Sequence, residues 1–586
     1  MNQTVQSAPE RRESTNPTWQ RTASWVWLGL AVIVLVAAVL RLTGIGQGLP
    51  HVVGSDEGFE IHRALRLGKG EFDFERVGKG GYFYLLFAEY AGYFAWLAVT
   101  GKVSSAADFA AHFARDLTPF WLIARVSTAL IAVAIVIQVF VLGRRMFSAT
   151  VGLFAAAVLS ISTLHIAHSH VVNVDLPMLL LLIWTLQICY EWADPDSKAR
   201  PVMLGVVFGS AVMTKLPAAV GILPILAANW LRCSNQSWRQ VFFSRDLRIA
   251  GLAAAVVYFL GNPGMALNLG KISGIFMRDI MGILPADDLY AGSTSPSSHW
   301  LFYWHSLVWT IGLPVAVLAV VGMFYALLRR TRADIILLSL GIPYFLTVAL
   351  AQSPDHSYSW YVLPLTPVAA ILAARVAFEI VERLPESPRL RLGFVSAMTV
   401  ILLIHPAAQT ASWLRRYSNI DSRLVARQWI EDNIATGAKI FALGNPIREQ
   451  SVSVPLRDSR ENVLRLIEEV EGESKAKAEF LRLRSELSQG VPYNLVTALH
   501  SEPVQTLQAY EALGVRYFVL TSRFFWPEIA LRDTKHPIGI SQSRVALFEE
   551  LNSNPGVRKI FSVDATANNR PGPSIEIYEL EVTDHR

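Results

Sequence analysis

The chain has 586 residues, of which 52% are hydrophobic and 17% are charged, and its mean hydropathy is +0.35. Soluble domains contain about 25% charged residues, so this deficit argues against a purely soluble enzyme. Two cysteines and abundant aromatic residues exclude a disulfide-stapled, collagen-like or disordered protein. The formal charge of +5 is too small to indicate nucleic-acid binding.

Long apolar runs recur through the first 417 residues and stop there. Residues 24–40 contain no charged side chain, and about 17–25 apolar residues span the hydrocarbon core of a bilayer. Similar runs begin near Thr118, Val151, Asp175, Pro201, Ala218, Ile249, Trp300, Ile335, Tyr361 and Leu392. Residues 421–586 are rich in charge and contain no such run. The sequence therefore predicts a polytopic α-helical membrane protein of about 11 spans, followed by a C-terminal soluble α/β domain.

The charged linkers between the runs predict the orientation. Arg11, Arg12 and Arg21 precede the first run, whose length and flanks exclude a cleaved signal peptide. If residues 81–100 do not cross the membrane, every basic linker lies on the side of the N-terminus, which the positive-inside rule assigns to the cytoplasm. These linkers are 144–145, 198–200, 232–248, 329–332 and 383–391. We therefore expect residues 81–100 to lie at the outer interface or to re-enter the membrane.

This topology divides the chain into three parts. They are a cytoplasmic tail (1–22), a transmembrane domain (23–417) with outer loops at 43–117 and 267–299, and an extracytoplasmic domain (418–586). The stretch 201–231 is short for two crossings and is expected to form a hairpin of short helices. Cys189 and Cys233 fall near cytoplasmic ends, where a disulfide is not expected.

The polar residues of the membrane domain gather on the outer side of this topology. The first outer loop contains Asp56 and Glu57. Later outer turns and loops contain, in chain order, His165, His168, His170, Asp175, Lys215, Arg278 and Tyr361. Ionisable residues at membrane depth are costly and are functional by default. A carboxylate can take a proton from a hydroxyl, and lysine or arginine can bind a lipid phosphate, so this set suits group transfer from a phosphate-activated lipid.

Each of these residues also has an ordinary structural explanation. Asp175-Leu-Pro fits a helix N-cap with proline in the first turn, and Lys215 can extend to lipid headgroups without any ligand. His168 and His170 indicate a metal only weakly, because two histidines two residues apart do not share a helix face. The order of these residues along the chain is therefore more informative than any one of them.

Five stretches occur in an order that resembles a known family. They are Arg41-Leu-Thr-Gly-Ile-Gly46 leading to Asp56-Glu57, Gly143-Arg-Arg-Met-Phe147, the histidine-rich turn ending in Asp175, Gly209-Ser-Ala-Val-Met-Thr-Lys215, and Tyr361-Val-Leu-Pro-Leu-Thr-Pro367. In this order they resemble the polyprenyl-phosphate-sugar-dependent glycosyltransferases of the GT-C superfamily. The resemblance is strongest to glycosyltransferase family 39, which includes the protein O-mannosyltransferases and the bacterial lipid A aminoarabinose transferases. The start of the outer domain, residues 421–431, is similar to bacterial members.

The resemblance implies a GT-C-like fold and a role for each matching residue. Asp56 would be the base that takes the acceptor proton, and Glu57 would support Asp56 or the donor sugar. Asp175 would lie near the donor headgroup, Lys215 would bind the lipid phosphate, and Arg278 in the long outer loop would assist. Further candidates for donor binding are His168, His170 and Tyr361.

The C-terminal domain shows an alternation of helices and strands. Residues 421–434 have the apolar spacing of an amphipathic helix, with Asp421 or Ser422 as N-cap. Further helices are predicted at 474–488 and 543–553, and strands at 439–443, 516–520 and 574–578. The domain contains no glycine-rich phosphate loop and no metal-ligand spacing, so its expected role is that of a cap or of acceptor recognition.

The sequence thus predicts an inverting glycosyltransferase of a bacterial inner membrane. Its donor would be a polyprenyl-phosphate sugar, and its acceptor a hydroxyl of a glycan, lipid or protein. Neither a nucleic-acid partner nor a cofactor is expected, and the use of a divalent metal stays open. Three rival classes also stay open: a transporter or flippase of polyprenyl lipids, a polymerase or ligase of surface polysaccharide, and a membrane-anchored binding protein. Charges at one face favour the transferase, since transporters place them at mid-membrane.

Overall fold

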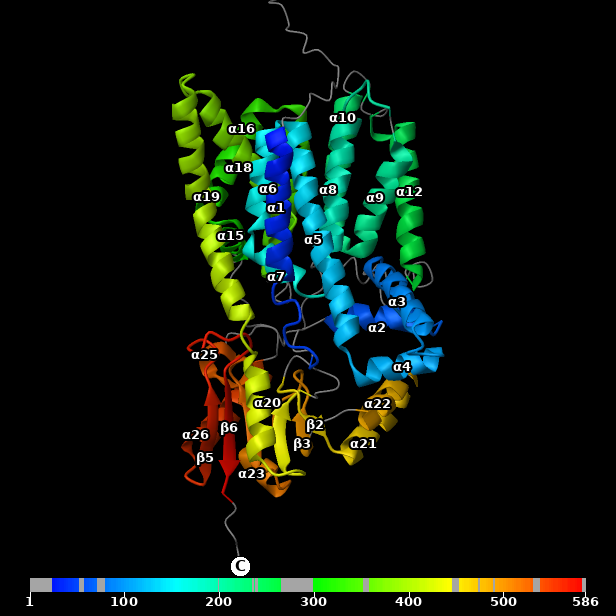
Figure 1. Ribbon diagram of the computed structural model, residues 1–586, viewed down its shortest axis with the longest axis vertical. Coiled ribbons are helices and arrows are strands. Elements are labelled where there is room, and N and C mark those ends of the chain that lie inside the picture. The colour runs from blue at the N-terminus through cyan, green and yellow to red at the C-terminus, as the bar shows by residue number, and fades with distance from the viewer. Residues whose placement is uncertain are drawn as a thin grey trace, which may run out of the picture.

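The protein consists of a bundle of long helices and a smaller domain that contains a sheet (Figure 1). The computed structural model describes residues 24–51, 57–70, 80–198, 200–233, 237, 241–264, 299–350, 358–444, 453–472, 475–487, 491–530 and 538–581. Figure 1 shows the long helices side by side in the upper body and the C-terminal strands below them. The predicted fold class, a helical membrane bundle followed by an α/β domain, is confirmed.

Every predicted apolar run corresponds to a helix of the bundle. The helices are α1 (Ser24–Leu42), α5 (Thr118–Met146), α6 (Ala149–Ser160), α8 (Asp175–Trp192), α9 (Pro201–Thr214), α10 (Ile222–Arg232), α12 (Arg245–Gly261), α16 (Leu313–Arg329), α17 (Arg332–Leu350), α18 (Leu365–Glu382) and α19 (Pro388–Tyr417). The run that begins at Trp300 comprises α15 (His299–Ile311) and α16, which form a bent pair. Short helices connect other members of the bundle: α7 (Thr163–Ser169), η1 (Leu216–Gly221) and η6 (Ser359–Val362).

Not all of these helices are long enough to cross a bilayer alone. In the described part of the chain, four helices meet both the length and the hydropathy expected of a span, or up to six if each of two bent helix pairs is counted as one span. Helix α9 has 14 residues, which at about 1.5 Å per residue is about 21 Å, shorter than the roughly 30 Å hydrocarbon core. The predicted hairpin of short helices over 201–231 is therefore confirmed. The predicted total of about 11 crossings includes helices that are too short to cross a bilayer alone.

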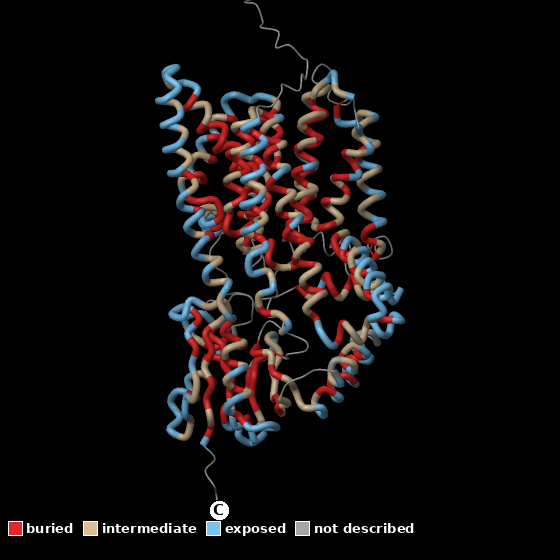
Figure 2. Tube along the Cα trace, in the orientation of Figure 1, coloured by how far each residue is buried: buried red, intermediate tan, exposed pale blue. Residues whose placement is uncertain are grey.

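The outer surface of the bundle is apolar. Large hydrophobic side chains are exposed along α1, α12, α16 and α19, among them Trp25, Leu28, Leu252, Phe324 and Ile401. Figure 2 shows that the buried positions concentrate in the interior helices of the bundle, whereas the peripheral α19 is largely exposed. A surface of this kind is unfavourable in water and matches lipid. The protein is therefore a multi-pass membrane protein.

A second, smaller layer lies at the end of the bundle that faces the C-terminal domain. It contains α2 (Glu57–Leu67), α3 (Tyr82–Val99) and α4 (Ala106–Arg115), which Figure 1 shows beside the lower part of α5. The hydroxyl of Tyr90 donates to the Phe120 carbonyl at 3.0 Å, and the hydroxyl of Tyr82 lies 2.6 Å from that of Thr128. Helix α3 thus packs on α5 outside the bundle of long helices, in agreement with the prediction that 81–100 does not cross.

The basic linkers meet at the opposite end of the bundle. Arg145 at the end of α5 pairs with Glu191 at the end of α8, and Arg332 pairs with Asp194 at 3.1 Å. The guanidinium of Arg144 lies over the ring of Trp27, near the start of α1. The structure therefore confirms that these linkers lie at the same end of the bundle as the start of α1.

The C-terminal domain is a mixed sheet flanked by helices. It contains β1 (Lys439–Leu443), β2 (Arg457–Asp458), β3 (Pro492–Ala498), β4 (Tyr517–Thr521), β5 (Val557–Val563) and β6 (Ile575–Leu580) in the order β2-β3-β1-β4-β6-β5. Strands β1 to β4 pair in parallel, whereas β6 is antiparallel to β4 and β5. The helices include α20 (Ser422–Asn433), α23 (Leu507–Ala512) and α26 (Ile538–Ser553).

Most of the predicted elements of this domain are present. Asp421 is the N-cap of α20, where its side chain accepts a hydrogen bond from the Arg423 amide, as predicted. Strands β1, β4 and β6 and helices α20, α22 (Lys475–Leu487) and α26 match the predicted positions. The sequence analysis missed β2, β3, β5, α21 (Arg460–Glu471) and the short helices α23, α24 (Ser522–Phe525) and α25 (Pro527–Ala530). Helices α21 and α22 form an arm with its own apolar core, in which Val463, Leu466, Ile467, Val470, Ala478 and Leu481 are buried.

Candidate functional site

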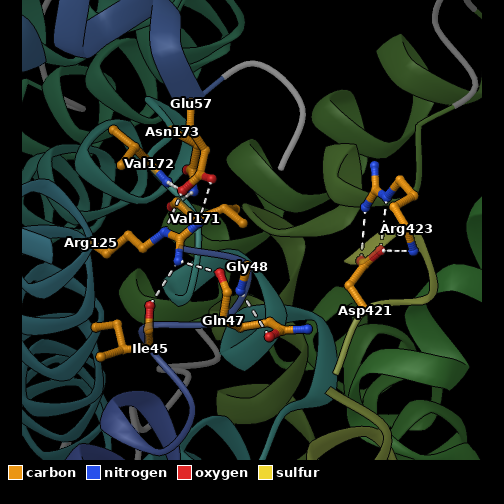
Figure 3. A network of polar contacts seen from close by, with 10 residues as sticks. All are labelled: Ile45, Gln47, Gly48, Glu57, Arg125, Val171, Val172, Asn173, Asp421 and Arg423. Carbon is orange, nitrogen blue, oxygen red and sulfur yellow. Dashed lines mark hydrogen bonds and ion pairs between the residues drawn. The ribbon is translucent and has the colours of Figure 1, made fainter. Parts of the chain in front are cut away.

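Among the described residues of the membrane domain, the most buried ion pair joins Glu57, the first residue of α2, to Arg125 of α5 (Figure 3). The Arg125 Nε donates to Glu57 Oε1 and Nη2 donates to Oε2, each at 2.7 Å. The two side chains are 1% and 0% exposed. Bidentate geometry of this kind compensates the desolvation of both charges.

Arg125 also fixes the backbone that leads from α1 into the first loop. Its Nη1 donates to the carbonyls of Ile45 and Gln47 at 2.9 and 2.8 Å. The amide of Val172 donates to Glu57 Oε1 at 3.1 Å. One ion pair thus connects three segments that lie far apart in the sequence: the first loop, α5, and the turn before α8.

That turn continues directly to a second ion pair. The side-chain oxygen of Asn173 accepts hydrogen bonds from the amides of Asp175 and Leu176, and therefore caps the start of α8. Its side-chain nitrogen donates to the His168 carbonyl at 2.7 Å. The alternative that Asp175 is itself the N-cap is therefore wrong, because Asp175 is the first residue of the helix and its carboxylate is engaged elsewhere.

The carboxylate of Asp175 binds the ammonium of Lys215, with Nζ 2.6 Å from Oδ1. Lys215 follows the last residue of α9 in extended conformation. A side chain at Gly209 would place its Cβ 2.6 Å from the Ala254 carbonyl of α12, so glycine lets α9 and α12 approach closely. This packing explains why the motif that ends in Lys215 begins with glycine.

Aromatic rings complete the surroundings of this lysine. The ammonium of Lys215 lies 5.1 Å from the ring centroid of Tyr361 in η6, which is within cation–π range. The neighbouring Trp360 stacks on Tyr358 and contacts the edge of His168 at a centroid distance of 5.4 Å. The structure thus brings together four predicted site residues: His168, Asp175, Lys215 and Tyr361.

His170 faces a different direction from His168. Its two ring nitrogens lie 2.8 Å from the carbonyls of Ile166 and Thr43, and its ring contacts Trp413 and Tyr417 of α19. Both nitrogens are therefore occupied by backbone oxygens. Among the residues that the structure describes, no group of three His, Cys, Asp or Glu side chains could hold a metal ion.

Arg41 explains the first of the family motifs. It is fully buried and donates to the carbonyls of Leu159 and Ser160 at 3.1 and 2.9 Å, at the end of α6. Its Nη2 is also 2.9 Å from Nδ1 of His165. Arg41 therefore satisfies the free carbonyls of a buried helix end and fixes the histidine-rich segment that leads to Asp175.

Two predicted site residues, Asp56 and Arg278, lie outside the described residues. One central residue, Arg125, was missed by the sequence analysis. It stands alone among apolar residues in the run that begins at Thr118. An isolated arginine at such a position is the signal that could have identified it.

Comparison with known proteins bears on this part of the chain. Residues 120–262 match the family described as dolichyl-phosphate-mannose-protein mannosyltransferase. The matched segment contains Arg125, Asp175 and Lys215. A search of curated protein sequences finds no match.

Solved structures with a similar fold are distant in sequence. The apo oligosaccharyltransferase of Archaeoglobus fulgidus is 13% identical over 89% of this chain and 73% of its own, with a TM-score of 0.49. ArnT from Cupriavidus metallidurans, solved with undecaprenyl phosphate, is 15% identical over 94% of this chain and 98% of its own, with a TM-score of 0.49. Likenesses at this level establish neither activity nor substrate. The family match over residues 120–262 confirms the resemblance that the motifs predict, to glycosyltransferases of the GT-C superfamily.

Proposed function

We propose that this membrane protein is a glycosyltransferase, which transfers a sugar from a polyprenyl-phosphate donor to a hydroxyl of a glycan, lipid or protein. The Asp175–Lys215 pair is the observation that supports the proposal most strongly. It lies at the end of the bundle that faces the C-terminal domain, within the segment that matches a family named for a lipid-phosphate-linked sugar. Reaction at this end would occur where the lipid headgroup meets water.

Lys215 has the properties needed to bind the phosphate of the donor. An ammonium has three donors, so Lys215 can keep its bond to Asp175 and still donate to a phosphate oxygen. Its side chain is only 13% exposed, and charge–charge attraction is stronger in such a site than in water. The Nε2 atom of His168 is buried and has no partner among the described residues, and it offers a further contact to the donor.

Asp56 is the proposed base. It precedes Glu57 in the chain, and Glu57 itself has both carboxylate oxygens engaged by Arg125. Glu57 is therefore suited to a positioning role and Asp56 to proton transfer. Asp56 would take the proton of the acceptor hydroxyl while the hydroxyl oxygen attacks the anomeric carbon of the donor sugar. The bond from that carbon to the phosphate oxygen breaks, and a single displacement inverts the configuration.

The proposed orientation follows from the basic linkers. With these at the cytoplasmic face, the N-terminus is cytoplasmic and the site and the C-terminal domain are extracytoplasmic, in a bacterial inner membrane. Accessibility of engineered cysteines at the exposed positions 102, after α3, and 330, in a basic linker, tests this orientation. Labelling of position 330 from outside intact cells would contradict it.

The central test compares Asp56→Asn with the wild-type protein. Membranes that contain either protein are incubated with candidate polyprenyl-phosphate sugars, with and without a chelator, and sugar transfer is followed. We expect transfer to fall by about 10²–10⁴-fold in Asp56→Asn, the usual contribution of a general base. Asp116→Asn is the matched control, because Asp116 is an exposed carboxylate at the same end of the bundle, and it should transfer normally.

Equal transfer by wild type and Asp56→Asn would refute the assignment of the base. Movement of the donor across vesicle membranes without any transfer would instead support the flippase alternative. Loss of transfer in the presence of the chelator would show that a divalent metal takes part.

A further inference from the structure

The C-terminal domain contacts the first outer loop at two places, one on each side of Asp56 in the sequence. The first contact involves residues 43–51, which follow α1, and the second involves α2, which begins at Glu57. These are the same two segments that Arg125 holds from the side of the bundle. The first loop is therefore bound by the bundle on one side and by the C-terminal domain on the other.

The first contact is polar. The guanidinium of Arg427 in α20 donates to the ring of His51, with Nη1 2.8 Å from Nε2. The side-chain nitrogen of Gln47 donates to the carbonyl of Asn419, between α19 and α20, at 3.1 Å. Because the Gln47 carbonyl also accepts from Arg125, this residue joins the loop to both parts of the protein.

The second contact is mainly apolar. Phe480 of α22 contacts the ring of His62 in α2 at a centroid distance of 5.4 Å and that of Phe113 in α4 at 5.2 Å. It packs against the buried aromatic cluster that also contains Trp121 of α5. At the end of α2, Lys69 lies 2.6 Å from Glu479 of α22.

These two interactions differ in strength. Lys69 and Glu479 are 39% and 58% exposed, and such surface pairs contribute little. Phe480 instead removes an aromatic surface from water, with an edge contact to the ring of His62 and a tilted contact to that of Phe113, which is the stronger kind of interaction. Of these two contacts between the arm of α21 and α22 and the α2 segment, that of Phe480 is therefore the stronger.

We propose that Phe480 and Arg427 are positioning residues, through which the C-terminal domain holds α2 and residues 43–51, and thereby Glu57, in the arrangement that sugar transfer requires. The proposal rests on the proposed function and goes beyond it. The C-terminal domain is then part of the catalytic arrangement, in addition to any role as a cap. A displacement of about 1 Å at a reacting group can reduce a rate by about a hundredfold.

The first experiment uses Phe480→Ala in the full-length protein. We expect kcat to fall by about ten- to a hundredfold with little change in KM for the donor, because the donor phosphate binds Lys215 in another segment. The variant Phe480→Tyr should retain most of the wild-type activity, since tyrosine keeps the aromatic ring. The control is Leu464→Ala, which removes an exposed apolar side chain from α21 of the same arm and should leave transfer unchanged.

A second readout does not depend on activity. Hydrogen exchange of the backbone amides of residues 57–67 should accelerate in Phe480→Ala and stay unchanged in Leu464→Ala. Arg427→Ala should accelerate exchange in residues 43–51. Its matched control is Arg465→Ala, because Arg465 makes an exposed ion pair with Glu461 of the same i,i+4 type that Arg427 makes with Glu431.

The outcomes separate the two proposals. Unchanged exchange and unchanged kcat in Phe480→Ala would overturn the positioning role, whatever the reaction is. Faster exchange in α2 of Phe480→Ala, together with a wild-type protein that transfers no sugar from any donor, would support the contact and refute the proposed function. Equal loss of kcat in Phe480→Ala and Phe480→Tyr, with unchanged exchange, would also contradict positioning through the ring contact.

Discussion

The two ends of the helix bundle both contain ion pairs, but these pairs differ in burial and in what they connect. At the end with the basic linkers, Arg145 and Glu191 are 37% and 42% exposed and join the last turns of neighbouring helices. At the end that faces the C-terminal domain, Glu57 and Arg125 are almost fully buried. Their bonds fix a loop, a helix start and a turn from three separate parts of the chain.

The difference indicates what each set of charges does. Half-exposed pairs cost little desolvation and contribute little stability, so the half-exposed pairs at the end with the basic linkers add little to the fold. Burying charges is expensive, and a buried pair often stabilises a fold no better than apolar residues would. The Glu57–Arg125 pair also holds the backbone of separate segments, so it points to a requirement for defined geometry beside the first loop.

One pair at the linker end makes the comparison sharper. Arg375 of α18 pairs with the fully buried Asp334 of α17, and its guanidinium also lies over the rings of Phe147 and Tyr325. It is as buried as the pairs at the other end but lies far from the proposed site. It therefore serves as a control for burial without function.

The largest expected effect is that of Arg125→Met. Removing Arg125 leaves the Glu57 carboxylate buried without its partner, which should lower the free energy of unfolding by about 3–5 kcal/mol and release the first loop. We expect transfer per folded molecule to be lost. Arg375→Met should destabilise the purified protein to a similar extent in a thermal melt, yet its folded fraction should keep its activity. Equal activity losses in the two variants would remove the distinction between the two ends.

A smaller effect is expected from Lys215→Met. Loss of one preorganised donor to a developing negative charge typically lowers kcat by about 10²–10³-fold, and Lys215→Arg should retain part of the activity because it keeps the positive charge. Lys102→Met, at the end of α3 on the same side of the bundle, replaces an exposed lysine and should transfer normally. Transfer rates measured with a lipid-linked donor check this. Normal transfer by Lys215→Met would show that a group other than Lys215 binds the lipid phosphate.

The smallest effect is expected at the linker end. Glu191→Gln removes the half-exposed partner of Arg145 and should change the free energy of unfolding by less than about 1 kcal/mol. Transfer should be unchanged, because the pair lies at the opposite end of the bundle. A thermal melt and the same transfer assay test both statements. A large loss of transfer in Glu191→Gln would show that the two ends are coupled through α5 or α8.

Several features of the fold were predictable because they depend on local pattern. Apolar run length located each bundle helix, and the length of 201–231 indicated two short helices. The N-cap Asp421 and the strands β1, β4 and β6 followed from local sequence signals. Strand β5 was missed because its partner β6 decides its pairing, and such pairing is set by tertiary context more than by intrinsic preference.

The site was predictable in part. Counting crossings placed Asp175, Lys215 and Tyr361 at one end of the bundle, and the structure brings these residues into contact. The bond between Arg125 and Glu57 could not be predicted, because it depends on which way one residue of a long apolar helix faces. The contact between Phe480 and α2 joins residues more than 400 positions apart, and no local pattern records it.

The sequence by itself determined that this protein lies in a membrane, where its helices run and which end of the bundle contains its polar residues, because these follow from the hydrophobic effect acting on short stretches of chain. Only the tertiary structure decided which charges pair, which segments Arg125 connects and where the C-terminal domain contacts the first loop. The reason is physical: hydrogen bonds and ion pairs act over a few ångströms in defined directions, so they are determined only once distant segments have been brought together.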